Sequence, residues 1–272
     1  MIFGIATWAL DGDPLHERFD KLADMGFRAM SMVAAQQSQA EAQWDAVQRV
    51  LENRDLCITM HLCCGSGGAT GLDKALPPQI APVIEWQRRS GRIRNVTFDS
   101  AYRPDAADGE KAWNRESTIA GLRYACEQLT SQGIRVGIEN WLINHRLDQF
   151  RTIRDGVGRD DLAALLDVGH LNIALRTPEV KIPSAEAWIL DQPFEIIELH
   201  LHDNDGKLDQ HLPIGEGTLD LSPMVSALVK RGFDGVATVE LILKDSRSIN
   251  EKGVQAKYKR TRDAFARAFQ AG

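Results

Sequence analysis

The segment FEIIELHLHDNDGKLDQHLPIGEG, residues 194–217, joins an apolar run to a loop crowded with side chains that can bind metals. Residues 196–202 have the length and the branched apolar content of a buried strand. Residues 200–217 then contain three histidines and three aspartates and end in a Gly-Glu-Gly turn. Acidic and imidazole groups at the end of a buried strand are typical of the functional edge of an α/β fold.

The rest of the chain alternates short runs of this kind with longer amphipathic segments. The expected strands are residues 2–8, 28–34, 57–63, 94–100, 135–141, 162–168, 196–202 and 236–242. The expected helices between them include residues 14–27, 39–53 and 113–133. Because these alternations run from end to end without a linker, we predict an α/β fold, a single (β/α)8 TIM barrel forming one domain over residues 1–272. An open α/β sheet is the alternative, weakened because no G-x-G-x-x-G or P-loop follows the first strand.

Composition limits the partners and the compartment. The 272 residues carry a net charge of −6, which offers no basic surface for nucleic acid or anionic membranes. No run approaches the ~18 apolar residues of a membrane span, and the first residues lack the basic start of a signal peptide. The four cysteines, Cys57, Cys63, Cys64 and Cys126, follow no disulfide or zinc spacing, so we expect buried free thiols. We therefore expect a cytoplasmic protein that does not bind membranes and lacks the basic surface for non-specific nucleic-acid binding; a local basic cleft is the alternative.

A TIM barrel places its functional groups at the carboxyl ends of the strands. The expected strand ends carry Trp8, His61, Asp99, Glu139, Asp167 with His170, His200 with His202, and Glu240. Burying each of these carboxylates unpaired would cost several kcal/mol, and a cation at the barrel mouth would neutralise them together. The sharpest candidates come one each from the last four strands: Glu139, Asp167, His200 and Glu240. The structural alternative for these four is a set of ion pairs with arginines at the rim.

Four segments carry a resemblance to the xylose isomerase-like TIM-barrel superfamily. They are GIENW (137–141), LLDVGHLNIA (165–174), HLHDNDGKLDQHLPIGEGTLDL (200–221) and VATVEL (236–241). That superfamily contains sugar isomerases and epimerases, inosose-processing enzymes and the endonuclease IV class of apurinic/apyrimidinic endonucleases. The resemblance extends over most of the chain and agrees with the barrel prediction.

The resemblance implies a metal-dependent sugar enzyme. In the sugar isomerases and epimerases, the positions matching Glu139, Asp167, His200 and Glu240 bind one divalent ion, and the two matching glutamates exchange protons with the substrate. Such an oxygen-rich set suits Mn²⁺ best, with Mg²⁺, Co²⁺ or Zn²⁺ as alternatives. We therefore expect a divalent-metal-dependent isomerase or epimerase of a sugar, sugar phosphate or inosose-like polyol, working through a metal-stabilised enediolate. His170 is the third residue expected to contact the substrate.

The endonuclease IV class gives the main alternative, a zinc phosphodiesterase acting on abasic DNA. There, the positions matching His170, Asp209 and His211 hold one zinc of a three-metal cluster, and His61 matches a ligand of another. The chain departs from this pattern at the fourth strand, where Asp99 stands in place of the expected histidine. This departure and the acidic charge favour the sugar enzyme.

Other interpretations remain open from the sequence. A sugar dehydratase or lyase would use the same chemistry, and a non-catalytic polyol-binding barrel is a further hypothesis. His202 lies two residues beyond His200, so it faces the same side of the strand and is a candidate for substrate or second-metal contact. Trp8 and Trp141 are candidates for an apolar wall under a sugar ring, with buried packing as the alternative. Residues 61–78 are expected to form a flexible lid or an irregular loop. The sequence does not declare a homo-oligomer interface, although barrels of this kind often dimerise.

Overall fold

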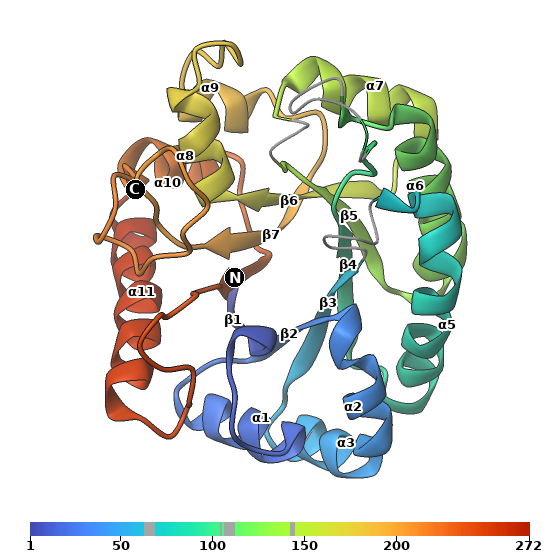
Figure 1. Cartoon of the computed structure of the whole chain (residues 1–272), viewed down its shortest axis with the longest axis vertical. Helices are drawn as coiled ribbons and strands as arrows, with labels where there is room; N and C mark the ends of the chain where they lie inside the picture. Colours follow the sequence, from blue (N-terminus) through green and yellow to red (C-terminus); the bar gives the residue numbers. More distant parts are fainter. Residues whose placement is uncertain (63–68, 104, 106–111, 142–144) are drawn as a thin grey trace.

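In the computed structural model, eight parallel strands close into one barrel in chain order, and helices surround it (Figure 1). The structure describes residues 1–62, 69–103, 105, 112–141 and 145–272. The strands are β1 (Ile2–Ala6), β2 (Ala29–Val33), β3 (Cys57–Leu62), β4 (Ile93–Phe98), β5 (Arg135–Glu139), β6 (Leu162–Asp167), β7 (Ile196–Leu201) and β8 (Val236–Val239). Pairing of β1 with β8, with Gly4 opposite Thr238, closes the cylinder. The predicted TIM barrel is confirmed.

The helices and short 3-10 turns lie between the strands. The α-helices are α1 (Leu15–Asp24), α2 (Gln37–Ala42), α3 (Trp44–Asn53), α5 (Leu72–Ser90), α6 (Arg115–Leu129), α7 (Leu147–Val157), α8 (Val168–Arg176), α9 (Ala185–Leu190), α10 (Leu221–Lys230) and α11 (Lys252–Ala271). The 3-10 turns are η1 (Thr7–Ala9), η2 (Ala34–Gln36) and η4 (Thr130–Gln132). The helices cover the outside of the barrel, so both faces of the parallel sheet are buried.

Two local predictions differ from the structure. The helix expected over residues 39–53 is two helices, divided at Gln43, whose φ of −117° is not helical. The Gln43 side chain accepts a hydrogen bond from the Leu15 backbone at the start of α1, a tertiary contact that periodicity does not show. The expected lid over residues 61–78 is helical from Leu72, where α5 begins and continues through three prolines. Burial of its face, including Leu76 and Trp86, outweighs the lost backbone hydrogen bonds.

The apolar core lies mainly between the strands and the helix ring. Trp44 of α3 stacks on Trp86 of α5 with ring centroids 4.9 Å apart. Helices α5 and α6 approach so closely that a Cβ on Gly121 would lie 2.3 Å from the Leu72 Cβ. In the described part of the chain, none of the helices has the length and apolar character needed to cross a membrane.

The cysteine prediction is only partly right. Cys126 is a buried free thiol, whereas Cys57 is partly exposed at the start of β3, where the strand meets the solvent at the amino end of the barrel. Burial raises the pKa of the Cys57 thiol to about 11. Cys63 and Cys64 lie outside the described residues.

Candidate active site

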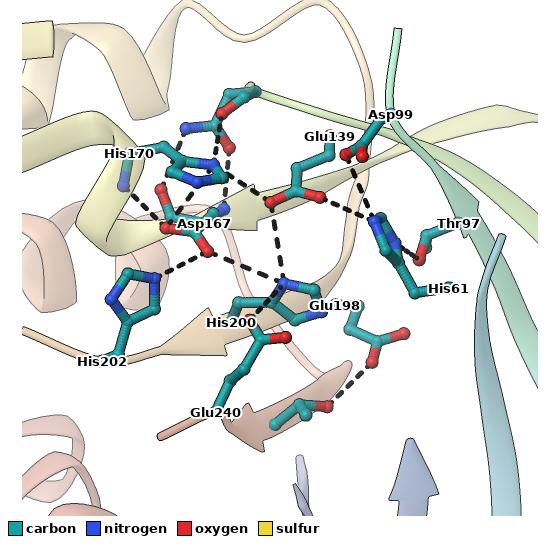
Figure 2. A network of polar contacts seen from close by, with 12 residues as sticks. His61, Thr97, Asp99, Glu139, Asp167, His170, Glu198, His200, His202 and Glu240 are labelled. Carbon is teal, nitrogen blue, oxygen red and sulfur yellow. Dashed lines mark hydrogen bonds and ion pairs between the residues drawn. The ribbon is translucent and has the colours of Figure 1, made fainter. Parts of the chain in front are cut away.

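The carboxyl ends of β3 to β8 bring the expected acids and histidines together at the barrel mouth (Figure 2). These side chains come from positions as far apart as His61 and Glu240, and most are less than 10% exposed. The group comprises His61, Asp99, Glu139, Asp167, His170, His200, His202, His211 and Glu240, with Asp209 beside it and 29% of its side chain exposed. All ten acids and histidines that sequence analysis named as site candidates lie in or beside this one cluster.

The centre of the cluster is the imidazole of His200. Its Nδ1 lies 3.0 Å from Glu240 Oε2, 3.6 Å from Glu139 Oε1 and 3.7 Å from Asp167 Oδ2. Glu139 and Glu240 reach it from opposite sides (Figure 2). The ion pairs of Asp167 and Glu240 are therefore with histidines, and the expected alternative of arginine pairs does not describe them.

Local structure holds Asp167 in place. It is the N-cap of α8, and its Oδ1 accepts the His170 backbone N–H at 2.7 Å, which satisfies a free donor of the first turn. Asn140, which directly follows Glu139 of β5, also binds Asp167. Its side chain donates to Asp167 O at 2.9 Å and accepts from Asp167 N at 2.7 Å. Glu139 and Asp167 are thereby kept in register.

A second group lies on the β3–β4 side of the mouth. His61 Nε2 is 3.2 Å from Asp99 Oδ1 and 3.1 Å from Glu139 Oε2, and His61 Nδ1 lies 2.9 Å from the Thr97 hydroxyl. Glu139 therefore belongs to both groups, with one oxygen toward His61 and the other toward His200. One donor atom from each of His61, Asp99 and Glu139 lies within 4.8 Å of the others.

A third group is carried by α8 and the loop after β7. Asp209 Oδ2 is 3.3 Å from His170 Nε2 and 3.2 Å from His211 Nε2. His211 adopts a φ of +49°, a conformation that side-chain-bearing residues rarely adopt, and its carbonyl accepts the Ile242 N–H at 3.1 Å. The loop is thereby joined to the segment that follows β8.

Asp203, which sequence analysis did not single out, anchors that loop. It is fully buried, and its carboxylate accepts four backbone N–H groups: Asn204 and Leu219 on Oδ1, Gly215 and Gly217 on Oδ2. The available signal was its place directly after His202, in front of a loop rich in glycine. Asp203 fixes the segment from which Asp209 and His211 project.

Mutual charge stabilisation dominates the electrostatics of the mouth. Burial opposes the ionisation of Glu139, but the neighbouring His61 and His170 outweigh it and hold its pKa well below the usual range. The pKa of Glu240, opposed by burial and lowered by His200, falls to about 2. Burial likewise opposes protonation of His200, yet Glu240 raises the pKa of that imidazole well above 6.5. Glu139 and Glu240 are thus ionised, and His200 holds a proton.

A buried carboxylate that sequence analysis missed lies deeper in the barrel. Glu198 of β7 accepts hydrogen bonds from Thr59 (2.9 Å), Thr238 (2.8 Å) and Asn95 (3.2 Å). Burial raises the pKa of the Glu198 carboxyl, and these three hydrogen bonds partly offset that effect. Residues two apart on a strand point to the same face, so Glu198 faces the barrel interior as His200 does. This spacing of two was the sequence signal for Glu198.

The remaining sequence candidates lie at the rim. Trp8 donates its indole N–H to Glu240 Oε1 at 3.0 Å, so it orients this carboxylate. Trp141 packs near Tyr102 with ring centroids 5.6 Å apart. Outside the cluster, on the loop after β7, Lys207 is exposed and Glu216 forms a surface ion pair with Arg260.

The residues present fit a divalent cation. One donor atom each from Glu139, Asp167 and His200 lies within 4.8 Å of the others, and Glu240 adds a further oxygen beside His200. Two atoms bound to one octahedral ion at ~2.1 Å stand about 3 Å apart when they are adjacent. An imidazole and three carboxylates therefore suit Mn²⁺, Mg²⁺, Co²⁺ or Zn²⁺.

The fold and the acid-and-histidine mouth define a TIM-barrel protein with a candidate metal centre. Residues 19–264 match the family model of the xylose isomerase-like TIM barrel, and the chain belongs to that family. The chain is 30% identical over 150 residues to the uncharacterized protein MJ1311 of Methanocaldococcus jannaschii. This match covers 53% of the chain and 50% of that protein, so the chain spans about half the length of this curated relative.

Several solved structures share the fold over their whole length. A D-tagatose 3-epimerase-like protein superposes with a TM-score of 0.76 at 19% identity, covering 100% of this chain and 99% of the other. The D-psicose 3-epimerase of Clostridium cellulolyticum H10 has a TM-score of 0.76 at 14% identity, with 99% of both chains covered. The 3-keto-D-glucoside 4-epimerase YcjR of E. coli has a TM-score of 0.72 at 17% identity, covering 98% and 99%.

Proposed function

We propose that this protein is a divalent-metal-dependent epimerase or isomerase of a sugar, a sugar phosphate or an inosose-like polyol. The observation that carries the proposal is the placement of Glu139 and Glu240 on opposite sides of His200 at the barrel mouth (Figure 2). Membership of the xylose isomerase-like family supports the proposal, as does the shared fold with a sugar 3-epimerase and a sugar 4-epimerase.

Glu139, Asp167, His200 and Glu240 are the residues that would hold the cation. When bound, a divalent ion supplies Lewis-acid stabilisation of the negative charge that develops on substrate oxygens during proton abstraction. Mn²⁺ is the first choice for a site with three carboxylates and one imidazole. The same four residues remain buried and aligned through their mutual ion pairs.

The two glutamates are suited to move a proton on either face of one carbon. Both are ionised, since their pKa values lie below the usual range, so each can accept a proton from a carbon next to a carbonyl. Trp8 holds the Oε1 atom of Glu240 and leaves Oε2 to face the centre. One glutamate removes the proton, and the other, after taking up a proton from solvent, delivers it to the opposite face of the carbon, which inverts that carbon.

His170 and Asp209 are placed to bind substrate hydroxyls. His170 Nδ1 lies 3.1 Å from Glu139 Oε1, and its Nε2 faces Asp209, whose side chain reaches the solvent at the mouth. A donor and an acceptor side by side match the hydroxyl groups of a polyol. We propose that a small carbohydrate is the substrate and that His170 orients it beside Glu139.

The experiment is deuterium incorporation by the purified protein. A panel of free and phosphorylated ketoses and inososes is incubated in D₂O with the Mn²⁺-loaded protein, and exchange of the carbon-bound hydrogen is followed by NMR. We expect exchange with one substrate class, its loss after chelation and its return with Mn²⁺. Glu240→Gln should abolish exchange, whereas Glu216→Gln, which alters only a surface ion pair, should not.

The outcome against the proposal is equally specific. Three Zn²⁺ ions per chain together with cleavage of abasic DNA would instead assign an endonuclease IV-like activity. The neighbouring groups His61, Asp99, Glu139 and His170, Asp209, His211 make metal counting essential to this decision. Full activity after exhaustive chelation would overturn metal dependence itself.

A further inference from the structure

His202 lies behind the proposed metal ligands and makes one hydrogen bond to them. It is fully buried, and its Nε2 lies 2.9 Å from Asp167 Oδ2. Since an ionised carboxylate only accepts, the His202 Nε2–H is the donor. Its Nδ1 is buried and makes no hydrogen bond within the described residues. The His202 ring therefore contacts the proposed metal ligands through the Nε2 hydrogen bond to Asp167, and its other contacts are made by packing.

We propose that His202 is a positioning residue that fixes the carboxylate of Asp167 for cation binding, an inference that rests on the proposed function. Both oxygens of Asp167 are held: Oδ1 by the His170 backbone N–H at 2.7 Å, and Oδ2 by His202 at 2.9 Å (Figure 2). With both oxygens held, the carboxylate plane cannot rotate freely, and Oδ2 stays 3.7 Å from His200 Nδ1. Groups behind metal ligands commonly orient them in this way.

The surrounding residues lock the ring itself. A Cβ built on Gly169 of α8 would lie 2.0 Å from His202 Cε1 and 2.5 Å from its Nδ1. Only glycine at position 169 therefore leaves room for the imidazole. The ring also stacks on His211, with centroids 4.0 Å apart and planes 13° from parallel. His202 thus contacts both the start of α8 and the loop that carries Asp209, and it joins these two parts of the site.

The first test compares two amides at position 202. The terminal nitrogen of Gln reaches about as far as His Nε2, whereas that of Asn reaches only as far as Nδ1, so Gln alone retains a donor to Asp167. We measure the affinity of the metal-free proteins for Mn²⁺ by calorimetry, with far-UV circular dichroism to confirm folding. His202→Asn should weaken Mn²⁺ binding by about 10- to 100-fold, the effect typical for groups behind a metal ligand, and His202→Gln by much less.

The second test uses the glycine. Gly169→Ala places a better helix former in α8 but pushes the ring away, so Mn²⁺ binding should weaken at least tenfold although His202 is intact. In the His202→Ala background the ring is gone, and adding Gly169→Ala should then change the affinity less than twofold. Additive losses in this double-mutant cycle would overturn the proposal, because they would mean that Gly169 acts independently of the ring.

The outcomes separate this inference from the proposed function. If the His202→Asn variant binds Mn²⁺ as tightly as the wild-type protein, the positioning role of His202 is refuted. The proposed function would stand in that case, because the wild-type protein would still bind Mn²⁺ and exchange deuterium. Equal losses in the Gln and Asn variants would also overturn it, because the donor to Asp167 would then be irrelevant. Failure of the wild-type protein to bind Mn²⁺ would refute the metal centre first and this inference with it.

Discussion

Replacement of Asp203 by Asn should loosen the loop that carries Asp209 and His211. The Asp203 carboxylate is fully buried and accepts backbone N–H groups from Asn204, Leu219, Gly215 and Gly217 at 2.8–3.0 Å. Asparagine has nearly the same shape but only one acceptor oxygen. Its amide nitrogen would face two N–H donors, so one pair of backbone donors would lose its acceptor.

The magnitude follows from the two donors that lose their partner. A buried donor left without an acceptor costs about 1–3 kcal/mol, so the loop should lose about 2–6 kcal/mol of local stability. Such a loss corresponds to a rise of about 30-fold or more in the hydrogen-exchange rate of amides that open with the loop. The barrel strands, paired on both sides, should keep their protection.

Hydrogen exchange followed by NMR measures this directly. The amides of Gly215, Gly217 and Leu219 should exchange faster in Asp203→Asn, while those of the barrel strands change little. Asp205→Asn is the matched control, because Asp205 accepts the Lys207 and Leu208 N–H groups at the surface, where water can replace it. Unchanged protection of the three amides, or an equal effect of the control, would refute the role of Asp203 as the anchor.

Three further predictions concern packing and proton linkage. Gly121→Ala should destabilise the protein by about 1–3 kcal/mol because the new Cβ collides with α5, whereas Gly253→Ala in open space on α11 should not, as urea unfolding will show. Tyr258→Phe should cost about 1–2 kcal/mol in the same assay, since its hydroxyl is a donor to the buried Leu241 carbonyl at 3.1 Å. Because the pKa of His200 lies well above 6.5 and a cation must displace its proton, Mn²⁺ affinity should rise up to about tenfold per pH unit and keep rising above pH 6.5. If calorimetry shows that the Mn²⁺ affinity levels off at pH 6.5, His200 is not held in its protonated form by Glu240.

The strands were predictable because their signal is local. Each of the eight appears where an apolar run indicated it, since a strand buried on both faces needs such a run whatever its neighbours are. Strand ends were less accurate: β8 ends at Val239, not at residue 242, and β1 ends at Ala6, where η1 begins. These ends depend on where the partner strand stops pairing, which is a property of the assembled barrel.

The predictions of helix boundaries and loops were wrong where a tertiary contact outweighed a local conformational preference. The break at Gln43 coincides with its hydrogen bond to the start of α1, and α5 continues through Pro77, Pro78 and Pro82 because its apolar face packs on the barrel. Local propensity favours the opposite outcome in both places. Neither contact partner is close in the sequence.

The sequence by itself determined the fold class and the set of acids and histidines at the strand ends. It did so because strand period, apolar runs and residue type are written along the chain, and a barrel turns every strand end toward one mouth. Only the tertiary structure decided which atoms meet: that His202 donates to Asp167, that Gly169 makes room for its ring, and that Asp203 gathers four amides. Such contacts join residues that lie up to tens of positions apart in the sequence. A shift of about 1 Å would break them, so they depend on the packing of the whole barrel.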